Sequence, residues 1–464
     1  MVLEIVILAA GKGKRMLSDL PKVLHPVAGQ SMLAHVIKTA QKLNPAKIHV
    51  VVGHKAEVVE NAIASLPDEI KSNVTCALQK EQLGTGHAVA CALPAVADDA
   101  EVLVLYGDTP LTPCEVLADF LQDGQSYDLC VLSAYADNPF GYGRIVRNTE
   151  GNLDHIVEEK DASDEIRKIH EVNTGIICAK ASVLKEWLPK VQNNNSQGEY
   201  YLTDLAGMLS SSNHNVGLTM APRFDVLSGV NSKSQLAFAE RTYQRMQAEK
   251  LMKDYGVTLA DPDRIEVRGE LVCGHDCFID INCIFEGKVV LGDRVEIKAG
   301  CVIRDCEIGN DSVISPYTVM EETIAKKHAT IGPFARLRPG NVLEDEVHIG
   351  DFVEVKKSNI GKGTKAGHLS YLGDATLGEN VNVGAGTITC NYDGANKHKT
   401  VVGNDVFIGS DTQLVAPVTV PNGVTIGAGT TYTSRVKADD NALVITRAKE
   451  LVLDGYVRPV KAKK

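Results

Sequence analysis

The sequence predicts two dissimilar halves, an α/β domain with a mainly parallel sheet and a parallel β-helix, joined by one long helix. Short β-rich runs alternate with helical stretches over residues 1–230, which is typical of a three-layer α/β domain. An amphipathic helical stretch follows. Beyond about residue 261, aliphatic residues recur six positions apart, and this period fits stacked coils of a β-helix but neither a helix nor a hairpin series.

The first half begins with a predicted strand at 2–8, followed by a helix at 31–43 and strands at 48–52 and 102–106. The connecting helix is expected from Ser232 to Tyr255, because Ser232 and Gln235 have the spacing of a capping box and Gly256 stands where a helix stops. One apolar stripe runs along it. We therefore expect domains at 1–231 and 256–464, with a linker helix at 232–255.

The six-residue period is clearest in the last third of the chain. Its aliphatic positions are Leu291, Ile297 and Ile303; Ile308 and Ile314; Ile349 and Val355; Ile360, Ala366 and Leu372; Leu377 and Val383; and Val402, Ile408, Leu414, Val420 and Ile426. An insertion interrupts the repeat around 391–399. A single coil cannot bury its inner side alone, so the coils must stack into a prism. The basic tail at 457–464 has no periodicity and is expected to be loose.

Composition narrows the possible partners. The chain has 464 residues and a net charge of −11, which argues against nucleic-acid or anionic-membrane binding because there is no basic surplus to neutralise phosphates. The apolar runs are strand-length, and neither a signal peptide nor a membrane span is predicted, so a cytoplasmic protein is expected. Eleven cysteines then imply reduced thiols. Cys273, Cys277 and Cys283 suggest either a zinc site or core residues, and their place in the six-residue repeat favours the core.

A glycine-rich turn follows the first strand, as Leu8-Ala9-Ala10-Gly11-Lys12-Gly13-Lys14-Arg15-Met16, with Pro21-Lys22 shortly after. The glycines let backbone N–H groups approach phosphates, and Lys12, Arg15 and Lys22 can offset triphosphate charge. The segment is neither Gly-x-Gly-x-x-Gly nor a P-loop, so neither of those sites is predicted. Taken alone, it also fits an ordinary strand-to-helix turn with solvated lysines.

Two further segments favour a nucleotide site. Gln79 and the run Gln82-Leu83-Gly84-Thr85-Gly86-His87 supply amide donors and acceptors that can read the edge of a base. Tyr106-Gly107-Asp108 ends a strand, where open α/β sheets place their ligands. An aspartate there is a natural Mg²⁺ ligand, and the alternative is that it only caps the next turn.

These motifs, in this order, resemble the sugar-1-phosphate nucleotidyltransferases. With the repeat half included, nearly the whole chain resembles the bacterial family of bifunctional N-acetylglucosamine-1-phosphate uridyltransferases and glucosamine-1-phosphate acetyltransferases. The resemblance implies a Rossmann-like α/β nucleotidyltransferase domain, a left-handed parallel β-helix of hexapeptide repeats and a homotrimer formed through that β-helix. Lys14 departs from the family, which often has threonine or serine there.

The resemblance also assigns the first site. It implies that the nucleotide is bound by Leu8, Ala9, Ala10, Gly11, Gly13, Arg15, Lys22, Gln79, Gln82, Gly84, Thr85, Tyr106 and Gly107. It implies that UDP-N-acetylglucosamine is bound by Gly143, Glu158, Asn173 and Asn231, and that Mg²⁺ is held by Asp108 and Asn231. A sugar phosphate oxygen would then attack the α-phosphorus of UTP, with pyrophosphate leaving.

His368, within the repeat, is a candidate general base, because a free imidazole titrates at about pH 6.5 and acetyl transfer to an amine needs a proton acceptor. A lone histidine is more often only a surface or hydrogen-bonded residue. The resemblance places His368 at the family's base, with Glu354 and Asn391 as orienting partners. It implies Arg338, Lys356, Tyr371 and Asn382 as acetyl-acceptor residues, and Ala385, Asn391, Tyr392, Ser410, Ala428 and Arg447 as acetyl-CoA residues.

The expected function is therefore acetylation of glucosamine-1-phosphate followed by uridylyl transfer, which makes UDP-N-acetylglucosamine and, as the resemblance implies, feeds peptidoglycan and lipopolysaccharide synthesis. One alternative is a nucleotidyltransferase that has a single activity and uses the β-helix only as an oligomerisation scaffold. Another is a non-catalytic regulatory subunit. The polar set around His368 argues against the first, and Arg15, Lys22 and Asp108 argue against the second.

Overall fold

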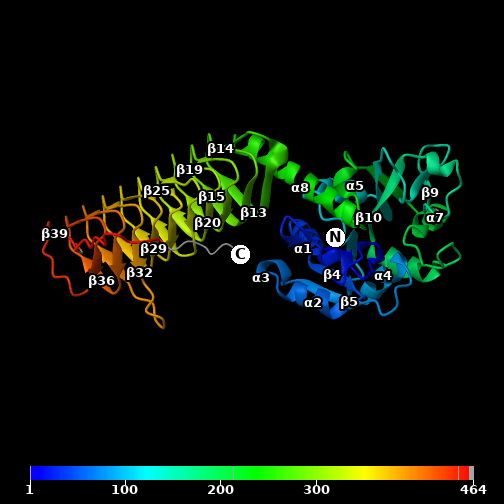
Figure 1. Cartoon of the computed structure of the whole chain (residues 1–464). Coiled ribbons are helices and arrows are strands. Elements are labelled where there is room, and N and C mark those ends of the chain that lie inside the picture. Colours follow the sequence, from blue (N-terminus) through cyan, green and yellow to red (C-terminus); the bar gives the residue numbers. More distant parts are fainter. Residues whose placement is uncertain (1, 213, 448, 459–464) are drawn as a thin grey trace. The chain divides into compact units, whose positions relative to one another are not determined.

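The computed structural model describes residues 2–212, 214–447 and 449–458 (Figure 1). The chain divides into two compact units, 1–244 and 245–464, and the predicted fold class is confirmed in both. Most of the basic tail predicted to be loose, residues 459–464, lies outside the described residues.

The first unit contains a mixed, mainly parallel sheet in which β10 alone among the seven central strands runs antiparallel to both of its neighbours. Along the sheet, the strands are β11 (Val216–Met220), β7 (Leu129–Tyr135), β10 (Glu171–Lys180), β6 (Ala100–Tyr106), β1 (Val2–Leu8), β4 (Lys47–Val52) and β5 (Val74–Leu78). The hairpin β8 (Arg144–Arg147) and β9 (Leu153–Val157) extends from β10, and β2 (Pro26–Val27) pairs with β3 (Gln30–Ser31). The predicted strands at 2–8, 48–52 and 102–106 are β1, β4 and β6.

The helices of this unit are α1 (Met32–Gln41), α2 (Ala56–Ala64), α3 (Asp68–Lys71), α4 (Thr85–Ala92), α5 (Cys114–Gly124), α6 (Ala181–Trp187) and α7 (Asp204–Ser210). α1 begins at the Ser31 cap, whose side chain accepts a hydrogen bond from the Ala34 N–H at 3.2 Å. Strands buried on both faces, such as β6, have continuous apolar sequences because helices cover both sides of a parallel sheet.

The long helix is present as α8 (Lys233–Asp254). At its start, the Ser232 hydroxyl accepts from the Gln235 N–H at 3.2 Å, and the Gln235 side chain accepts from the Asn231 N–H at 2.8 Å. The first half of α8 packs in the first unit, where the Tyr243 ring lies 5.3 Å from that of His35 and Glu240 accepts from the Ala28 N–H at 2.6 Å. The second half packs in the second unit, where Leu251 is buried in the β-helix core.

The second unit is a parallel β-helix whose coils stack in register. One face is an 11-stranded sheet made of β12 (Thr258–Leu259), β14 (Phe278–Ile279), β16 (Glu296–Ile297), β19 (Val313–Ile314), β22 (Thr330–Ile331), β25 (His348–Asp351), β28 (Lys365–His368), β31 (Asn382–Val383), β34 (Phe407–Ile408), β37 (Thr425–Ile426) and β39 (Leu443–Val444).

The remaining strands form a 17-stranded sheet. They are β13 (Ile265–Cys273), β15 (Cys283–Leu291), β17 (Val302–Arg304), β18 (Glu307–Ile308), β20 (Val319–Glu321), β21 (Thr323–Ala325), β23 (Arg336–Leu337), β24 (Asn341–Leu343), β26 (Glu354–Lys356), β27 (Asn359–Ile360), β29 (Tyr371–Gly373), β30 (Ala375–Leu377), β32 (Ile388–Cys390), β33 (Thr400–Val402), β35 (Gln413–Val415), β36 (Val418–Val420) and β38 (Thr431–Thr433).

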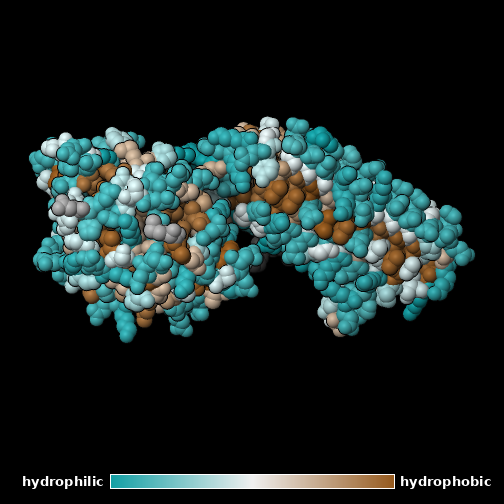
Figure 2. Space-filling view, turned by 180° about the vertical axis from the view of Figure 1, so that it is seen from behind, coloured by the Kyte–Doolittle hydropathy of each residue, from teal (hydrophilic) through white to brown (hydrophobic). Residues whose placement is uncertain are grey.

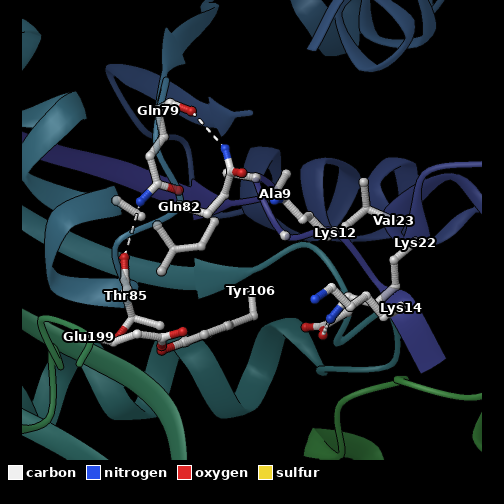
Figure 3. Close-up of a pocket in the computed structure, with 16 residues that line it drawn as sticks. Ala9, Lys12, Lys14, Lys22, Val23, Gln79, Gln82, Thr85, Tyr106 and Glu199 are labelled. Carbon is white, nitrogen blue, oxygen red and sulfur yellow. Dashed lines mark hydrogen bonds and ion pairs between the residues drawn. The ribbon is translucent and has the colours of Figure 1, made fainter. Parts of the chain in front are cut away.

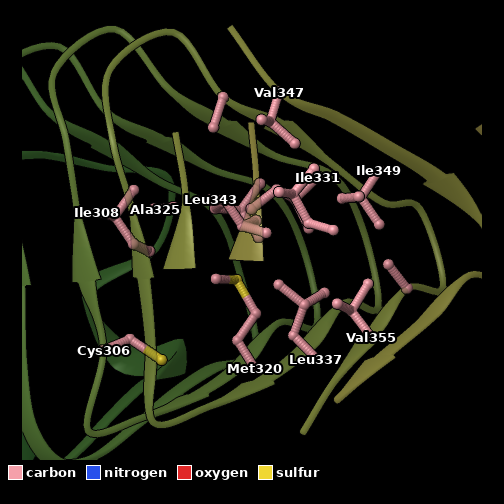
Figure 4. Packing of buried hydrophobic residues seen from close by; sticks show 14 of the residues in the cluster. Cys306, Ile308, Met320, Ala325, Ile331, Leu337, Leu343, Val347, Ile349 and Val355 are labelled. Atoms are coloured by element: carbon pink, nitrogen blue, oxygen red, sulfur yellow. The ribbon is translucent and has the colours of Figure 1, made fainter. Parts of the chain in front are cut away.

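The core of the β-helix consists of the aliphatic positions of the repeat. Ile331 pairs with Ile349, and Ile349 with Ala366, so equivalent residues form columns inside the prism (Figure 4). Each fully buried aliphatic side chain stabilises the fold by about 1.5–3 kcal/mol. Cys277 and Cys283 belong to this core and donate to the carbonyls of Gly292 at 3.0 Å and Lys298 at 3.3 Å.

The outer surface is mixed in character. On the face that Figure 2 shows, brown hydrophobic patches lie between hydrophilic residues along the β-helix. Among the described residues, no helix is both long enough and apolar enough to span a membrane.

Candidate active sites

The first candidate site is a cavity of about 460 Å³ at the carboxyl ends of β1 and β6. The predicted residues Leu8, Ala9, Ala10, Gly11, Lys22, Gln79, Gln82, Gly84, Thr85, Tyr106 and Asp108 line it. Figure 3 shows its two ends, with Lys14 and Lys22 at one and Gln79, Gln82 and Thr85 at the other. The structure therefore brings together residues that the sequence places in three separate motifs.

The amide end is held by hydrogen bonds among its own residues. The Gln79 side chain donates to the Gly84 carbonyl at 3.1 Å, and the Gln82 side chain donates to the Gln79 carbonyl at 3.1 Å. Gly84 has φ +114°, and a Cβ there would lie 2.6 Å from the Tyr200 carbonyl oxygen. A residue with a side chain cannot fit this turn, so the backbone of α4's start stays close to the cavity.

The cationic end is formed by the turn after β1. Gly13 has φ +58°, and a Cβ there would lie 2.6 Å from the Cβ of Lys22, so glycine allows the turn to pack against the stem of Lys22. Lys12 and Lys14 line the cavity. The predicted residues Gly13, Arg15 and Gly107 are not among the lining residues, and the Arg15 side chain is exposed beside the turn.

Lys22 joins the two predicted metal ligands. Its ammonium group forms an ion pair with Asp108 Oδ2 and donates to Asn231 Oδ1 at 3.0 Å. A carboxylate oxygen and an amide oxygen are donors suited to Mg²⁺, and a cationic group already lies between them. The residues present therefore fit a divalent cation at this position.

Three of the four predicted sugar residues lie together, with Asn173 on β10 and Gly143 and Glu158 at the ends of the β8–β9 hairpin, whereas Asn231 lies before α8 beside Lys22. The Asn173 N–H donates to the Gly143 carbonyl at 2.8 Å, and Thr203 donates to Glu158 Oε1 at 3.0 Å. Glu158 lines a second hollow, of about 540 Å³. Burial raises the pKa of the Glu158 carboxyl, although the Thr203 hydrogen bond opposes this shift. Burial and the charges of Glu158 and Asp108 raise the pKa of Tyr106, which therefore lies near both groups.

Three residues that line this cavity, Val23, Ala88 and Glu199, escaped the sequence analysis, as did Gly53, which packs behind the lining residue Ala10. Glu199 lines the cavity because its segment is hydrogen-bonded to the amide turn, with the Tyr200 N–H donating to the Leu83 carbonyl at 2.8 Å. Gly53 directly follows β4, and a Cβ there would lie 2.8 Å from that of Ala10. The sequence could have selected Gly53, because this glycine directly follows a buried strand that the sequence predicts. Nothing in the sequence singles out Glu199.

The second candidate site is on the β-helix around His368. The register from β28 to β31, β34 and β37 aligns Ala366 with Val383, Ile408 and Ile426. Two residues further along each coil, the same register gives a column of His368, Ala385, Ser410 and Ala428. Beyond the imidazole, the column contains only small side chains over three coils, a length of roughly 14 Å at the usual strand spacing. This leaves an open strip of surface beside His368.

The next column, one residue further along each coil, lies at a corner of the prism. Its side chains are large and apolar up to the coil of His368 and small or charged beyond it. On one side it contains Tyr317, Phe334, Phe352 and Leu369, which are 57%, 48%, 60% and 63% exposed. We call these four residues the corner ladder. The three rings stack with centroids 5.3 Å apart and interplanar angles of 10° and 8°. On the other side, Gly386, Asp411 and Gly429 follow. An exposed apolar strip thus ends where the small-residue column begins.

Cations gather on the 17-stranded sheet of the same coils. Arg338 and Lys356 occupy equivalent places on neighbouring coils, since β23 pairs with β26 and aligns Leu337 with Val355. The nearby Lys397 ammonium, followed by Arg338 and Lys357, lowers the pKa of Lys356. Lys397 belongs to the insertion at 391–399, and the sequence analysis did not select it. Several positive charges here suit a phosphate dianion.

The predicted partners of His368 make other contacts in the single chain. Glu354 Oε1 accepts from Arg338 at 3.0 Å, and the Asn391 side chain donates to Asp374 Oδ2 at 2.6 Å and to the Tyr371 hydroxyl at 3.4 Å. Within the described residues, neither is hydrogen-bonded to His368. His348 on β25 lies close enough for the charge of His368 to contribute to the lowering of its pKa, after burial and Lys365.

The other predicted acetyl-CoA and acceptor residues are distributed around the same coils. Asn382 is exposed on β31, one strand beyond β28. Arg447 donates to the Ala428 carbonyl at 2.7 Å, so it covers the far end of the small-residue column. The Tyr392 hydroxyl donates to the Gly394 carbonyl at 2.6 Å in the exposed insertion.

Comparison with known proteins gives one family for each unit. Residues 5–172 match the MobA-like NTP transferase domain, and residues 267–361 match the GMPPB C-terminal domain. The α/β unit is therefore a nucleotidyltransferase domain, and the β-helix contains a GMPPB-like C-terminal region.

Solved structures that match part of this chain were also found. A UDP-glucose pyrophosphorylase complexed with UDP-glucose is 16% identical, and the match covers 53% of this chain and 100% of that chain with a TM-score of 0.45. HddC from Yersinia pseudotuberculosis complexed with GMP-PN is 17% identical, over 52% of this chain and 99% of that chain, with a TM-score of 0.40.

Proposed function

We propose that this protein is a bifunctional enzyme that acetylates glucosamine-1-phosphate with acetyl-CoA and then transfers a uridylyl group from UTP, forming UDP-N-acetylglucosamine and pyrophosphate. The observation on which the two-activity proposal depends is the site around His368. Arg338, Lys356 and Lys397 lie close to one another, and His368 is on β28, the strand before β29, which pairs with the strand of Lys356.

In the uridylyl transfer, a phosphate oxygen of the sugar attacks the α-phosphorus of UTP, and the bond to the pyrophosphate oxygen breaks. Lys22, which lines the cavity, and Arg15, which is exposed beside it, offset phosphate charge, and the amide turn holds the base. Asp108 and Asn231 would hold Mg²⁺, which offsets further charge when it is bound. Glu158 and Asn173 hold the sugar, so both anionic reactants are aligned without a protein nucleophile.

In the acetyl transfer, the amine nitrogen attacks the thioester carbonyl as His368 accepts its proton. The carbon–sulfur bond then breaks, and the departing sulfur takes the proton from the imidazolium, so protons and electron pairs balance. Arg338, Lys356 and Lys397 would hold the acceptor phosphate. The small residues Ala385, Ser410 and Ala428 leave room for the extended arm of the thioester along the column.

One experiment tests both halves of the proposal. The protein is supplied with glucosamine-1-phosphate, acetyl-CoA, UTP and Mg²⁺, and free thiol and pyrophosphate are followed separately. We expect both to be released. If no thiol is released, and pyrophosphate appears only when N-acetylglucosamine-1-phosphate is supplied in place of glucosamine-1-phosphate, the result supports instead a nucleotidyltransferase with a scaffold. The GMPPB-like match fits this second candidate too, since it covers residues 267–361 and does not include His368.

We also propose that a second copy of this chain covers the corner ladder, in a homotrimer. His368 and Asn382 are exposed, and an exposed surface excludes water from a reacting amine only when something covers it. The ladder is apolar and ends beside His368. Phe334→Ser with Phe352→Ser should lower the trimer content in sedimentation and reduce thiol release. A normal trimer content in this double variant contradicts the proposal that the corner ladder is the interface between copies of the chain.

A further inference from the structure

Lys22 has a position that its expected role in phosphate binding does not explain. Its ammonium group contacts Asp108 Oδ2 and Asn231 Oδ1, the two oxygens that fit a metal ion, although these residues lie 86 and 209 positions away in the sequence. The side chains of Lys22 and Asp108 are only 15% and 12% exposed. The contact is therefore partly shielded from water, where charges interact more strongly than on an open surface.

The backbone and Cβ of Lys22 are held in place, but its ammonium group can move. The backbone lies in a short 3₁₀ turn, Lys22–Leu24, and the Cβ packs against Gly13. The same side chain lines the nucleotide cavity. A rotation of its outer bonds therefore suffices to move the ammonium group from the two oxygens towards a bound phosphate.

We propose that Lys22 is an internal competitor for the metal site: its ammonium occupies the cation position until a divalent metal, arriving with the nucleotide, takes Asp108 and Asn231 and releases Lys22 onto the phosphates. This rests on the proposed nucleotidyl transfer. A divalent ion held by these two oxygens would lie close to the ammonium group, and the two cations repel each other, so binding of the ion favours movement of Lys22 away from the oxygens. The metal and the nucleotide therefore bind cooperatively, and by linkage each strengthens the other equally.

The test uses the full chain, with Mn²⁺ as the metal probe and electron paramagnetic resonance to count free Mn²⁺. Without nucleotide, Lys22→Met should bind Mn²⁺ about fivefold or more tightly than the unaltered protein, a change typical of site coupling. Lys14→Met is the matched control, since Lys14 also lines the cavity but has no hydrogen bond or ion pair to Asp108. It should change Mn²⁺ affinity less than twofold. UTP affinity should fall in Lys22→Met.

The outcomes separate the possibilities. Equal or weaker Mn²⁺ binding by Lys22→Met overturns the proposal, as does an equal gain in Lys14→Met, which would indicate general charge removal. Adding Asp108→Asn to Lys22→Met must abolish the gain, and a gain that persists also overturns it. Mn²⁺ should raise the melting temperature of Lys22→Met more than that of the unaltered protein, which checks folding and binding together. Failure of the proposed function appears separately, as absence of pyrophosphate release by the unaltered protein.

Discussion

In the α/β unit the candidate site collects residues from Leu8 to Asn231, whereas in the β-helix most of its residues come from a few consecutive coils. The first arrangement gives a concave cavity, because loops at the ends of parallel strands surround a common point. The second gives a strip on a flat face, since every coil presents equivalent positions outward. A concave site can be complete within one chain, but a flat one needs a covering partner.

The sharpest test of this comparison is His368→Ala. It removes the proposed base and leaves Arg338 and Lys356 in place, so acetyl transfer should slow by a factor on the order of 10²–10⁴, the usual worth of a positioned base. Thiol release is measured at saturating glucosamine-1-phosphate. Uridylyl transfer should be unchanged, because the cavity lies in the other unit.

The control for this variant is assembly, measured by sedimentation. A normal thiol-release rate in an intact assembly rules out His368 as the base. If acetyl transfer is absent from the unaltered protein as well, the β-helix is a scaffold, and the difference between the two units is one of function as well as of shape.

The corresponding variant in the α/β unit is Asp108→Ala, which should affect only uridylyl transfer. Pyrophosphate release from UTP and N-acetylglucosamine-1-phosphate should fall by about 10²–10³-fold or more, since a charge-stabilising group is lost from the transition state. Thiol release should stay near normal. EDTA should have the same selective effect, and unchanged uridylyl transfer in Asp108→Ala would contradict the metal assignment.

The sequence was sufficient to predict the fold of both units, for different reasons. The six-residue period specifies which side chains point inward on every coil, and Ile349, Val355 and Ala366 do so. In the α/β unit the continuous apolar runs, such as 102–106, marked the buried strands. The antiparallel direction of β10 was not predicted, because strand direction depends on connections across the sheet and not on local pattern.

Much less of the site's geometry could be predicted. That Lys22 contacts Asn231 depends on a fold that brings together residues 209 positions apart, and no local pattern encodes this. Glu199 reaches the cavity only through backbone hydrogen bonds of its segment. Lys397 comes from the insertion, where the repeat no longer fixes the register. The small column after His368 follows from the period, because Ala385, Ser410 and Ala428 keep one place on successive coils.

A third prediction concerns where the two units separate. A fragment ending at residue 231 lacks the half of α8 that contains Tyr243, the buried Gln244 and the Glu240 contact with Ala28. We expect its free energy of unfolding to be about 2–4 kcal/mol lower than that of a fragment ending at 250, from lost packing and an unsatisfied N–H. Denaturant unfolding of both fragments measures this. Equal stability would place the boundary before α8.

The smallest expected effect is on stability, at Glu158. Burial raises the pKa of this carboxyl, so folding is favoured while the group is protonated and becomes less favourable as the pH rises from about 4.3, the value in an unfolded chain, through the raised pKa. Glu158→Gln resembles the protonated acid and can still accept the hydrogen bond from Thr203. At pH 7 it should therefore unfold at a higher denaturant concentration than the unaltered protein, and the difference should shrink as the pH falls through the raised pKa and disappear below about 4.3. Glu158→Gln should at the same time weaken binding of the sugar phosphate and leave thiol release unchanged. If Glu158→Gln is less stable than the unaltered protein at pH 7, or if its stability advantage grows as the pH falls, the result would contradict the view that the α/β unit keeps a destabilising buried charge in order to bind its ligand.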